Sequence, residues 1–163
     1  MIIDLGCGKN KRGDIGIDYN PKSDADIVCL LGFDPIPLVD NYADKVIAYD
    51  LLEHIPFVIY QDKQIKYPII YLMNEIWRIL KPNGIFEMTV PCYPSPFCFS
   101  HPTHTSVWTE DTIKFFLDIP PVFHPNWFKV KESYGIQCQF KLLEHKKLDT
   151  VRIKSVLQAI KNA

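Results

Sequence analysis

Short apolar runs separated by turn residues dominate the first half of the chain, and they predict strands. The expected strands are Ile2–Leu5, Asp14–Asp18, Asp26–Leu30, Ala43–Tyr49 and Ile85–Val90. Runs of this length, rich in isoleucine and valine and bounded by Gly, Asp or Pro, are typical of strands buried inside a sheet.

Before the last of these strands the apolar positions change to a helical spacing. Residues at i, i+3, i+4, i+7 and i+11 are apolar, namely Ile69, Leu72, Met73, Ile76 and Leu80. Pro68 suits the first turn of such a helix, and Pro82 ends it. The pattern predicts one amphipathic helix that packs against the sheet.

The last third of the chain predicts a short helix and two strands. Thr109 is a suitable N-cap for a helix that buries Ile113 and Phe116. Trp127–Tyr134 and Thr150–Val156 are interpreted as strands. Because no helical pattern separates them, we expect an antiparallel pair at the edge of the sheet.

Strands that alternate with helical patterns predict an α/β fold. We expect a Rossmann-like, mostly parallel sheet of about seven strands with an antiparallel edge pair. The length of 163 residues fits a single domain spanning residues 1–163. Only Lys9–Gly13 separate a glycine turn from the second strand, whereas a parallel crossover usually takes a dozen residues or more. The first crossover helix is therefore expected to be short or absent.

Composition and charge narrow the class of protein. Hydrophobic residues make up 47% and charged residues 23%, and the net charge is −1, so a nucleic-acid partner is not indicated. No apolar run approaches the ~20 residues of a membrane helix. The chain shows no export signal, and its five cysteines are scattered, so we expect reduced thiols and a cytoplasmic protein.

The most specific feature is the turn Gly6-Cys7-Gly8, which directly follows the first strand. A glycine turn lets the backbone approach a ligand, and ligands of open α/β sheets bind at the carboxyl ends of strands. The second strand ends in Asp18, an acid suited to both hydroxyls of a ribose. Together these features indicate a nucleoside-containing cofactor.

Four motifs in this order resemble class I S-adenosylmethionine-dependent methyltransferases, with the small type 11 group as the closest match. They are Asp4–Gly8, Gly16–Asp18, Leu52–Ile55 and Glu75–Gly84. The resemblance spans residues 2 to about 91. The segment His101–His104, followed by Trp108–Glu110, also looks like the later part of compact members.

The resemblance implies S-adenosylmethionine as cofactor and assigns roles around it. Gly6, Cys7 and Gly8 would pack their backbone against the methionine moiety. Asp4 would orient this turn or meet the amino group of that moiety. Asp18 would accept the ribose hydroxyls.

The resemblance also implies where the adenine and the reacting methyl group lie. Tyr19 would lie beside the adenine, and Asp50 and Leu51 would lie near the methyl-transfer centre. The family often has an acid after the third strand, but Leu30 and Leu31 stand here, and Asp34 is the nearest acidic residue. The third glycine of the turn is replaced by Asn10.

Methyl transfer to the acceptor, which the sequence does not identify, needs mainly positioning and a dry site. A general base helps when the acceptor is a protonated amine or a hydroxyl. Candidates are Glu53 and His54, after the fourth strand, and His101 and His104 in a proline-rich loop. A structural role for each of them is the alternative.

A metal site is not predicted, although one set of residues suggests it. Cys92, Cys98, His101 and His104 are zinc-type ligands. Their spacing matches neither a finger nor a ribbon, and two residues between histidines are fewer than usual. Buried cysteines that only pack are the simpler interpretation.

Two other functions stay open. A catalytically silent cofactor-binding or interaction module would keep the sheet and lack the lid, because no helices precede the first strand. A second copy of the chain would supply that lid in a homo-oligomer. An NAD-dependent enzyme would also use the strand-end acid, but Gly6-Cys7-Gly8 lacks the glycine continuation of that fingerprint.

Overall fold

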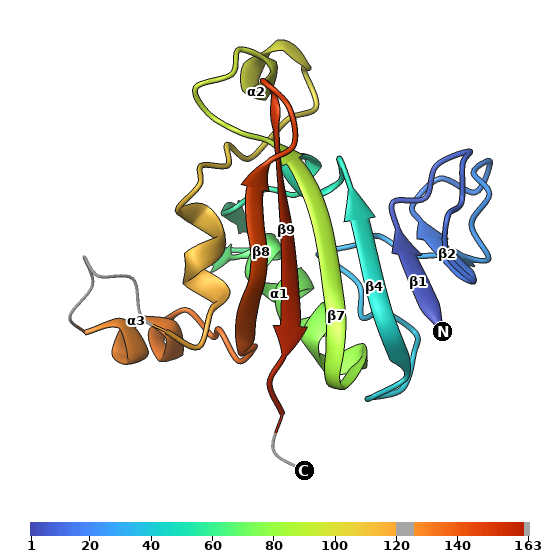
Figure 1. Ribbon diagram of the computed structural model, residues 1–163. Coiled ribbons are helices and arrows are strands. Elements are labelled where there is room, and N and C mark those ends of the chain that lie inside the picture. The colour runs from blue at the N-terminus through green and yellow to red at the C-terminus, as the bar shows by residue number, and fades with distance from the viewer. Residues whose placement is uncertain (120–125, 162–163) are drawn as a thin grey trace.

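The computed structural model describes residues 1–119 and 126–161, and its centre is a seven-stranded sheet (Figure 1). The strand order is β3-β2-β1-β4-β7-β9-β8. The strands are β1 (Ile2–Leu5), β2 (Ile15–Asp18), β3 (Ile27–Val28), β4 (Ala43–Tyr49), β7 (Leu80–Pro91), β8 (Phe140–Lys147) and β9 (Arg152–Ala159). The first five are parallel, and β9 runs antiparallel to both β7 and β8. The predicted α/β sheet with an antiparallel edge pair is confirmed.

One long helix, α1 (Pro68–Ile79), packs against this sheet and lies behind the strands in Figure 1. Its buried side chains Leu72, Met73 and Ile76 share one core cluster with Ile3 and Phe86 of the strands. The helical spacing found in the sequence is therefore the face that meets the sheet, except that Leu80, which was expected in the helix, begins β7. None of the helices among the described residues is long and apolar enough to cross a membrane.

Smaller elements fill the connections. They are η1 (Leu52–His54), β5 (Ile59–Gln61), β6 (Gln64–Lys66), α2 (Phe97–Ser100), η2 (Thr112–Phe116) and α3 (Trp127–Ser133). The hairpin β5–β6 turns through Asp62 and Lys63, which both have positive φ, as a two-residue hairpin loop requires. The helix expected from Thr109 is the 3-10 helix η2, in which Ile113 and Phe116 are buried.

The strand predicted at Trp127–Tyr134 is wrong, because this segment contains helix α3. Its aromatic and β-branched residues suggested a strand, but Trp127, Val130 and Tyr134 recur at i, i+3 and i+7, which is helical spacing. The antiparallel partner of β9 is instead β8, a strand rich in lysine. Lysines are common on edge strands, where they discourage pairing with other chains.

The first crossover contains no helix, as the sequence predicts. Strand β2 pairs with β1 directly after a tight loop, in which the Asp14 amide donates to the Ile2 carbonyl at 2.8 Å. The Ile2 amide in turn donates to the Asp14 carboxylate at 2.7 Å. These reciprocal hydrogen bonds hold the start of β2 beside β1 without a crossover helix.

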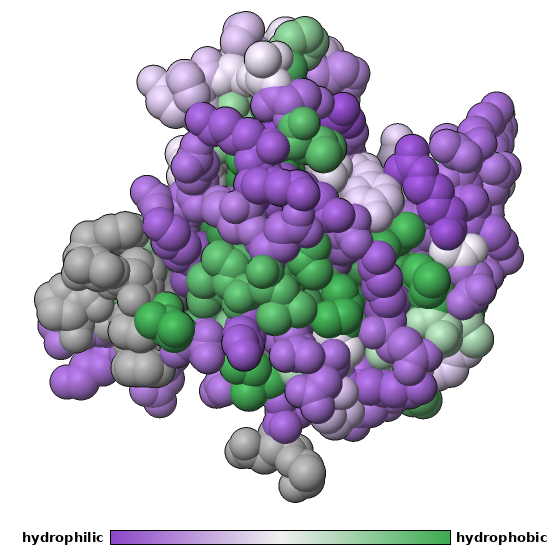
Figure 2. Space-filling model, viewed as in Figure 1, coloured by the Kyte–Doolittle hydropathy of each residue, from purple (hydrophilic) through white to green (hydrophobic). Residues whose placement is uncertain are grey.

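The sheet face opposite α1 is not covered by a helix of the described residues, although Ile47 on this face is only 4% exposed. No helix of the described part of the chain lies in front of the strands in Figure 1, and Figure 2 shows apolar residues gathered over the middle strands. Ile47 and Val156 share this face, because each pairs directly with Glu87 of β7. Parallel sheets are usually covered on both faces, so this uncovered apolar face is unusual.

Charged residues on the same face bind three strands together. The Glu87 carboxylate accepts from Lys45 of β4 at 2.7 Å, from Lys154 of β9 at 2.9 Å, and from the Tyr49 hydroxyl at 2.9 Å. Burial acts to raise the pKa of Glu87, but these three donors outweigh it and lower that pKa to about 2. Burial, followed by the hydrogen bond to Glu87, raises the pKa of Tyr49 to about 12.

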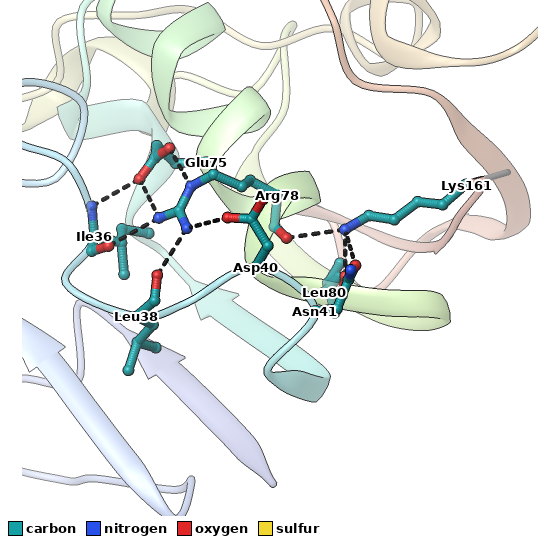
Figure 3. A network of polar contacts seen from close by, with 8 residues as sticks. All are labelled: Ile36, Leu38, Asp40, Asn41, Glu75, Arg78, Leu80 and Lys161. Atoms are coloured by element: carbon teal, nitrogen blue, oxygen red, sulfur yellow. Dashed lines mark hydrogen bonds and ion pairs between the residues drawn. The ribbon is translucent and has the colours of Figure 1, made fainter. Parts of the chain in front are cut away.

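A second polar network fastens α1 to the long connection between β3 and β4 (Figure 3). Arg78 binds Glu75 through two bonds of 2.7 Å and also donates to the carbonyls of Ile36 and Leu38. Glu75 accepts from the Ile36 amide at 2.8 Å. The carboxylate of Asp40 lies 2.9 Å from Arg78 on the outer side. The network therefore provides partners for its own charged groups and for the backbone of the connection, which has no secondary structure of its own.

Lys161 completes this network at the end of α1. Its ammonium donates to the carbonyls of Arg78 and Leu80 and to the Asn41 side chain, as Figure 3 shows. The last carbonyls of a helix lack partners within the helix, so a lysine at this end stabilises it.

We predict that Arg78→Met lowers the free energy of unfolding by about 3–5 kcal/mol, because it leaves the Glu75 carboxylate buried without its partner. The double variant Glu75→Gln/Arg78→Met should recover part of this loss, since glutamine still accepts from the Ile36 amide and carries no charge. Urea denaturation of the three proteins measures the effect. A loss below ~1 kcal/mol, or no recovery in the double variant, would contradict this role.

The Glu87 network predicts a pH dependence. A carboxyl whose pKa falls from 4.5 to about 2 on folding stabilises the fold at pH above 4.5, and this stabilisation is lost as the pH falls towards 2. Glu87→Gln should therefore cost about 3 kcal/mol at pH 7 and less than half of that at pH 3. Urea denaturation of both proteins at the two pH values tests this, and an equal difference at both would refute it.

Candidate active site

The glycine turn lies at the carboxyl end of β1 and is fastened to β2. Gly6 and Gly8 have φ values of +68° and +55°, which glycine adopts without strain. The Gly6 amide donates to the Ile17 carbonyl at 2.8 Å, and the Gly8 amide donates to the Asp18 carboxylate at 3.0 Å. The turn and the strand-end acid therefore form one unit.

Asp18 is held in place before any ligand arrives. Its side chain is 7% exposed, and its second oxygen accepts from the Asn20 amide at 2.8 Å. Each carboxylate oxygen has a further lone pair, so both can accept another hydrogen bond. Tyr19 follows with 70% of its surface exposed.

The two glycines serve different purposes. A Cβ on Gly6 would lie 2.8 Å from Cδ1 of Leu51, so this turn packs directly against the residue that follows β4. A Cβ on Gly8 would meet nothing within 4 Å. The turn is therefore closed at Gly6 and open at Gly8, where a ligand can approach the backbone.

Cys7 points into the protein. Its Sγ lies where a side chain on Gly16 would be, at 2.8 Å from that Cβ position. Burial, followed by the charges of Asp18 and Asp4, raises the pKa of the Cys7 thiol. A raised pKa disfavours the thiolate, which agrees with a packing role for the buried Cys7 side chain.

Asp4 binds the loop that follows the glycine turn. It is 3% exposed and accepts from the Arg12 amide at 2.6 Å. Burial raises the pKa of Asp4, against the opposing hydrogen bond and charge of Arg12. The Arg12 guanidinium also lies 5.2 Å from the centre of the Tyr49 ring. Asp4 therefore holds the loop that follows the glycine turn, whereas its expected role at the turn itself stays a prediction.

Asp50 directly follows β4 and has a left-handed conformation, with φ of +51°. Its amide donates to the Thr89 carbonyl at 2.9 Å, and its carboxylate lies 3.2 Å from Arg152 of β9. The sequence contains no signal for this ion pair, because the two residues are 102 positions apart.

These residues meet where the strand order reverses. From β1 the chain passes to β2 and β3 on one side, and then returns to β4 on the other side of β1. In open α/β sheets ligands bind in the crevice at such a switch point, outside the carboxyl ends of the strands. The structure brings Gly6, Asp18 and Leu51 to this point.

The histidine candidates also come together. The Thr105 and Ser106 amides donate to the Glu53 carbonyl at 2.8 and 3.1 Å, which binds their loop to η1. The ring centre of His54 lies 4.9 Å from that of His104 and 5.8 Å from that of His101. Burial, with the other two histidines adding to it, lowers the pKa of His54.

Glu53 lies beneath this loop and is 2% exposed. Its Oε2 is buried and has no hydrogen-bond partner within the described residues. Burial, with the charge of Asp50 adding to it, raises the pKa of Glu53 to about 7. The sequence marked Glu53 as a candidate base but held no signal for its burial.

The cysteines of the alternative zinc set do not join the histidines. Cys92 and Cys98 are buried, and burial raises the pKa of both thiols. Within residues 1–119 and 126–161, the side chains that converge as possible metal ligands are those of His54, His101 and His104.

Comparison with known proteins finds the fold and no close relative in sequence. No family profile and no curated protein matches the chain. A methyltransferase from Archaeoglobus fulgidus that depends on S-adenosylmethionine is similar in structure, with TM-score 0.58 and 14% identity over 96% of this chain and 85% of the other. One from Aquifex aeolicus gives TM-score 0.58 and 12% identity over 98% and 81%.

The same fold also supports other chemistry. The 4+2 cyclase SpnF gives TM-score 0.59 and 13% identity over 99% of this chain and 74% of the other. The chain therefore has the fold of class I S-adenosylmethionine-dependent methyltransferases, as its motifs indicate.

We predict that Gly6→Ala destabilises the protein more than Gly135→Ala does. Both glycines have positive φ, which costs alanine about 1–2 kcal/mol, but a Cβ on Gly135 meets nothing within 4 Å. The contact with Leu51 should add about 1–3 kcal/mol for Gly6→Ala. Thermal and urea unfolding of both variants tests this, and equal losses would show that the turn does not depend on Leu51.

Proposed function

We propose that this protein is an S-adenosylmethionine-dependent methyltransferase. The observation that carries the proposal is the glycine turn, which is tied to Asp18, packed on Leu51 and open at Gly8. Three segments far apart in the sequence thus form one cradle at the switch point of the sheet. The similar methyltransferase structures support the same conclusion through the fold.

The residues of the cradle fit this cofactor. Asp18 has free lone pairs for the two ribose hydroxyls, and the open backbone at Gly8 leaves room for the methionine moiety. We assign the exposed Tyr19 ring to the adenine, and Asp50 and Leu51 to the neighbourhood of the reacting group. When bound, S-adenosylmethionine would supply a methyl group on a sulfonium: an acceptor would attack the methyl carbon in line as the bond to sulfur breaks, and S-adenosylhomocysteine would leave.

We place the acceptor beside His54, His101 and His104. They belong to the loop and to η1 at the carboxyl end of β4, the same end of the sheet as the glycine turn. A neutral imidazole can accept a proton from an amine or hydroxyl acceptor. This assignment gives the residues a role in positioning and proton transfer and leaves the acceptor unidentified.

The NAD-dependent alternative is disfavoured by the first crossover. A dinucleotide fold places the pyrophosphate at the N-terminus of a helix after the glycine turn. Residues 9–14 contain no helix here. Another reaction on the same fold is the second candidate, because the cyclase SpnF shares this architecture. The silent cofactor-binding module stays as the alternative that the transfer assay below separates.

Calorimetric titration tests the cofactor. We expect binding of S-adenosylmethionine and S-adenosylhomocysteine at one site and no heat with NAD. Asp18→Asn should weaken binding about 10–100-fold, because it removes the charge that strengthens the hydrogen bonds to the ribose. Asp62→Asn is the matched control, since Asp62 lies in the hairpin turn and asparagine tolerates its positive φ.

Two glycine variants separate binding from stability. Gly8→Ala and Gly135→Ala should cost similar stability, since neither Cβ meets an atom within 4 Å. Only Gly8→Ala should weaken S-adenosylmethionine binding. Equal affinity in both variants would place the cofactor elsewhere.

Catalysis needs a separate readout. Radiolabelled S-adenosylmethionine is incubated with the protein and a cell extract, and methylated products are separated. Transfer that is lost in Asp18→Asn supports the methyltransferase. Binding without transfer would favour the silent module.

A further inference from the structure

We propose that His54, His101 and His104 form a binding site for a divalent transition-metal ion such as zinc. His54 ends η1, directly after β4, and the other two lie in the loop after α2. Their ring centres are 4.9, 5.2 and 5.8 Å apart, and one ligand nitrogen from each lies within 4.8 Å of the others. Imidazole nitrogens suit zinc, copper and nickel.

Two of the rings have the protonation pattern that a metal ligand needs. Nδ1 of His54 lies 3.2 Å from the Thr103 carbonyl, and Nδ1 of His104 lies 3.1 Å from the Phe97 carbonyl. A carbonyl only accepts, so Nδ1 carries the proton in both rings and Nε2 keeps its lone pair. A histidine that binds a metal usually donates its other N–H to a carbonyl or carboxylate in this way.

Thr103 connects the third ring to the first. Its hydroxyl oxygen lies 2.8 Å from Nδ1 of His54 and 2.8 Å from Nδ1 of His101. A hydroxyl has two lone pairs, so it can accept from both rings. The Thr103 amide also lies 3.4 Å from Nδ1 of His101 and favours the other tautomer. Metal binding would therefore move the His101 proton to Nδ1.

The geometry requires a small closure. Zinc–nitrogen bonds of ~2.0–2.1 Å in a tetrahedron place the ligand nitrogens about 3.3 Å apart. His101 is exposed, so its ring can rotate towards the other two. Three histidines leave the fourth position for water or an acceptor atom, as in catalytic zinc sites. A ring that binds the metal through Nε2 and carries its proton on Nδ1 no longer accepts a proton, so in the metal-bound protein the metal-bound water would take over the proton transfer assigned above to a free imidazole. The loop that carries His101 and His104 is held by the Glu53 carbonyl, so the site forms only in the folded chain.

The test is metal binding, which is read out independently of any methyl transfer. Tag-free protein is treated with a chelator and titrated with Zn²⁺ by calorimetry and with Co²⁺ by visible absorption. We expect one equivalent to bind, with Co²⁺ bands typical of nitrogen and oxygen ligands and none from thiolates. His101→Ala and His104→Ala should each weaken binding at least about 100-fold, and Thr103→Val should weaken it about 10-fold.

His145→Ala is the matched control. His145 lies on β8, with its Nδ1 2.9 Å from the Ser155 hydroxyl, and it is not part of the cluster. Unchanged affinity in this variant, together with loss in His101→Ala, supports the site. His101 is exposed, so that variant should fold normally, and circular dichroism checks this. No stoichiometric binding, thiolate bands, or binding retained in both cluster variants would overturn the proposal.

Discussion

The ion pair between Glu75 and Arg78 sets the geometry on which the candidate site depends. Strand β4 must return past β2 and β1 after β3, and the connection that makes this return contains no helix. Arg78 and Glu75 bind its backbone at Ile36 and Leu38 and fix it to α1. Without this attachment β4 would lack a fixed starting position beside β1. The return brings β4 beside β1, where the strand order reverses and where Gly6 contacts Leu51.

The presence of only one long helix among the described residues also explains the uncovered sheet face. One long helix covers one face, so residues on the other face must tolerate water although most of the sheet is parallel. Glu87 stabilises this uncovered face in part, because Lys45 and Lys154 pair with it across β4, β7 and β9. These ions bind three strands laterally where no helix holds them. Ile47 and Val156 remain apolar beside them, which gives the face its mixed character (Figure 2).

The sequence predicted the elements whose patterns are local. The parallel strands, α1 and the missing crossover helix followed from apolar runs, proline positions and a short spacing. α3 was interpreted as a strand because aromatic content outweighed its helical spacing. In the candidate site, Gly6, Gly8 and Asp18 were marked by motif, whereas the partners Arg152 and Thr103 were not. These partners meet their targets only through the tertiary fold, so no local pattern reveals them.

The histidine cluster depends on a backbone attachment between its loop and η1. The Glu53 carbonyl accepts from the Thr105 and Ser106 amides, and this contact lays the histidine loop over η1. It gathers His101 and His104 around His54 and at the same time buries the Glu53 carboxyl. Burying a carboxyl oxygen without a hydrogen-bond partner, as at Oε2 of Glu53, opposes folding, and a fold selected for stability alone would place an apolar residue at position 53. A buried carboxyl beneath three converging imidazoles is instead the arrangement expected where proton transfer or ligand binding matters more than stability.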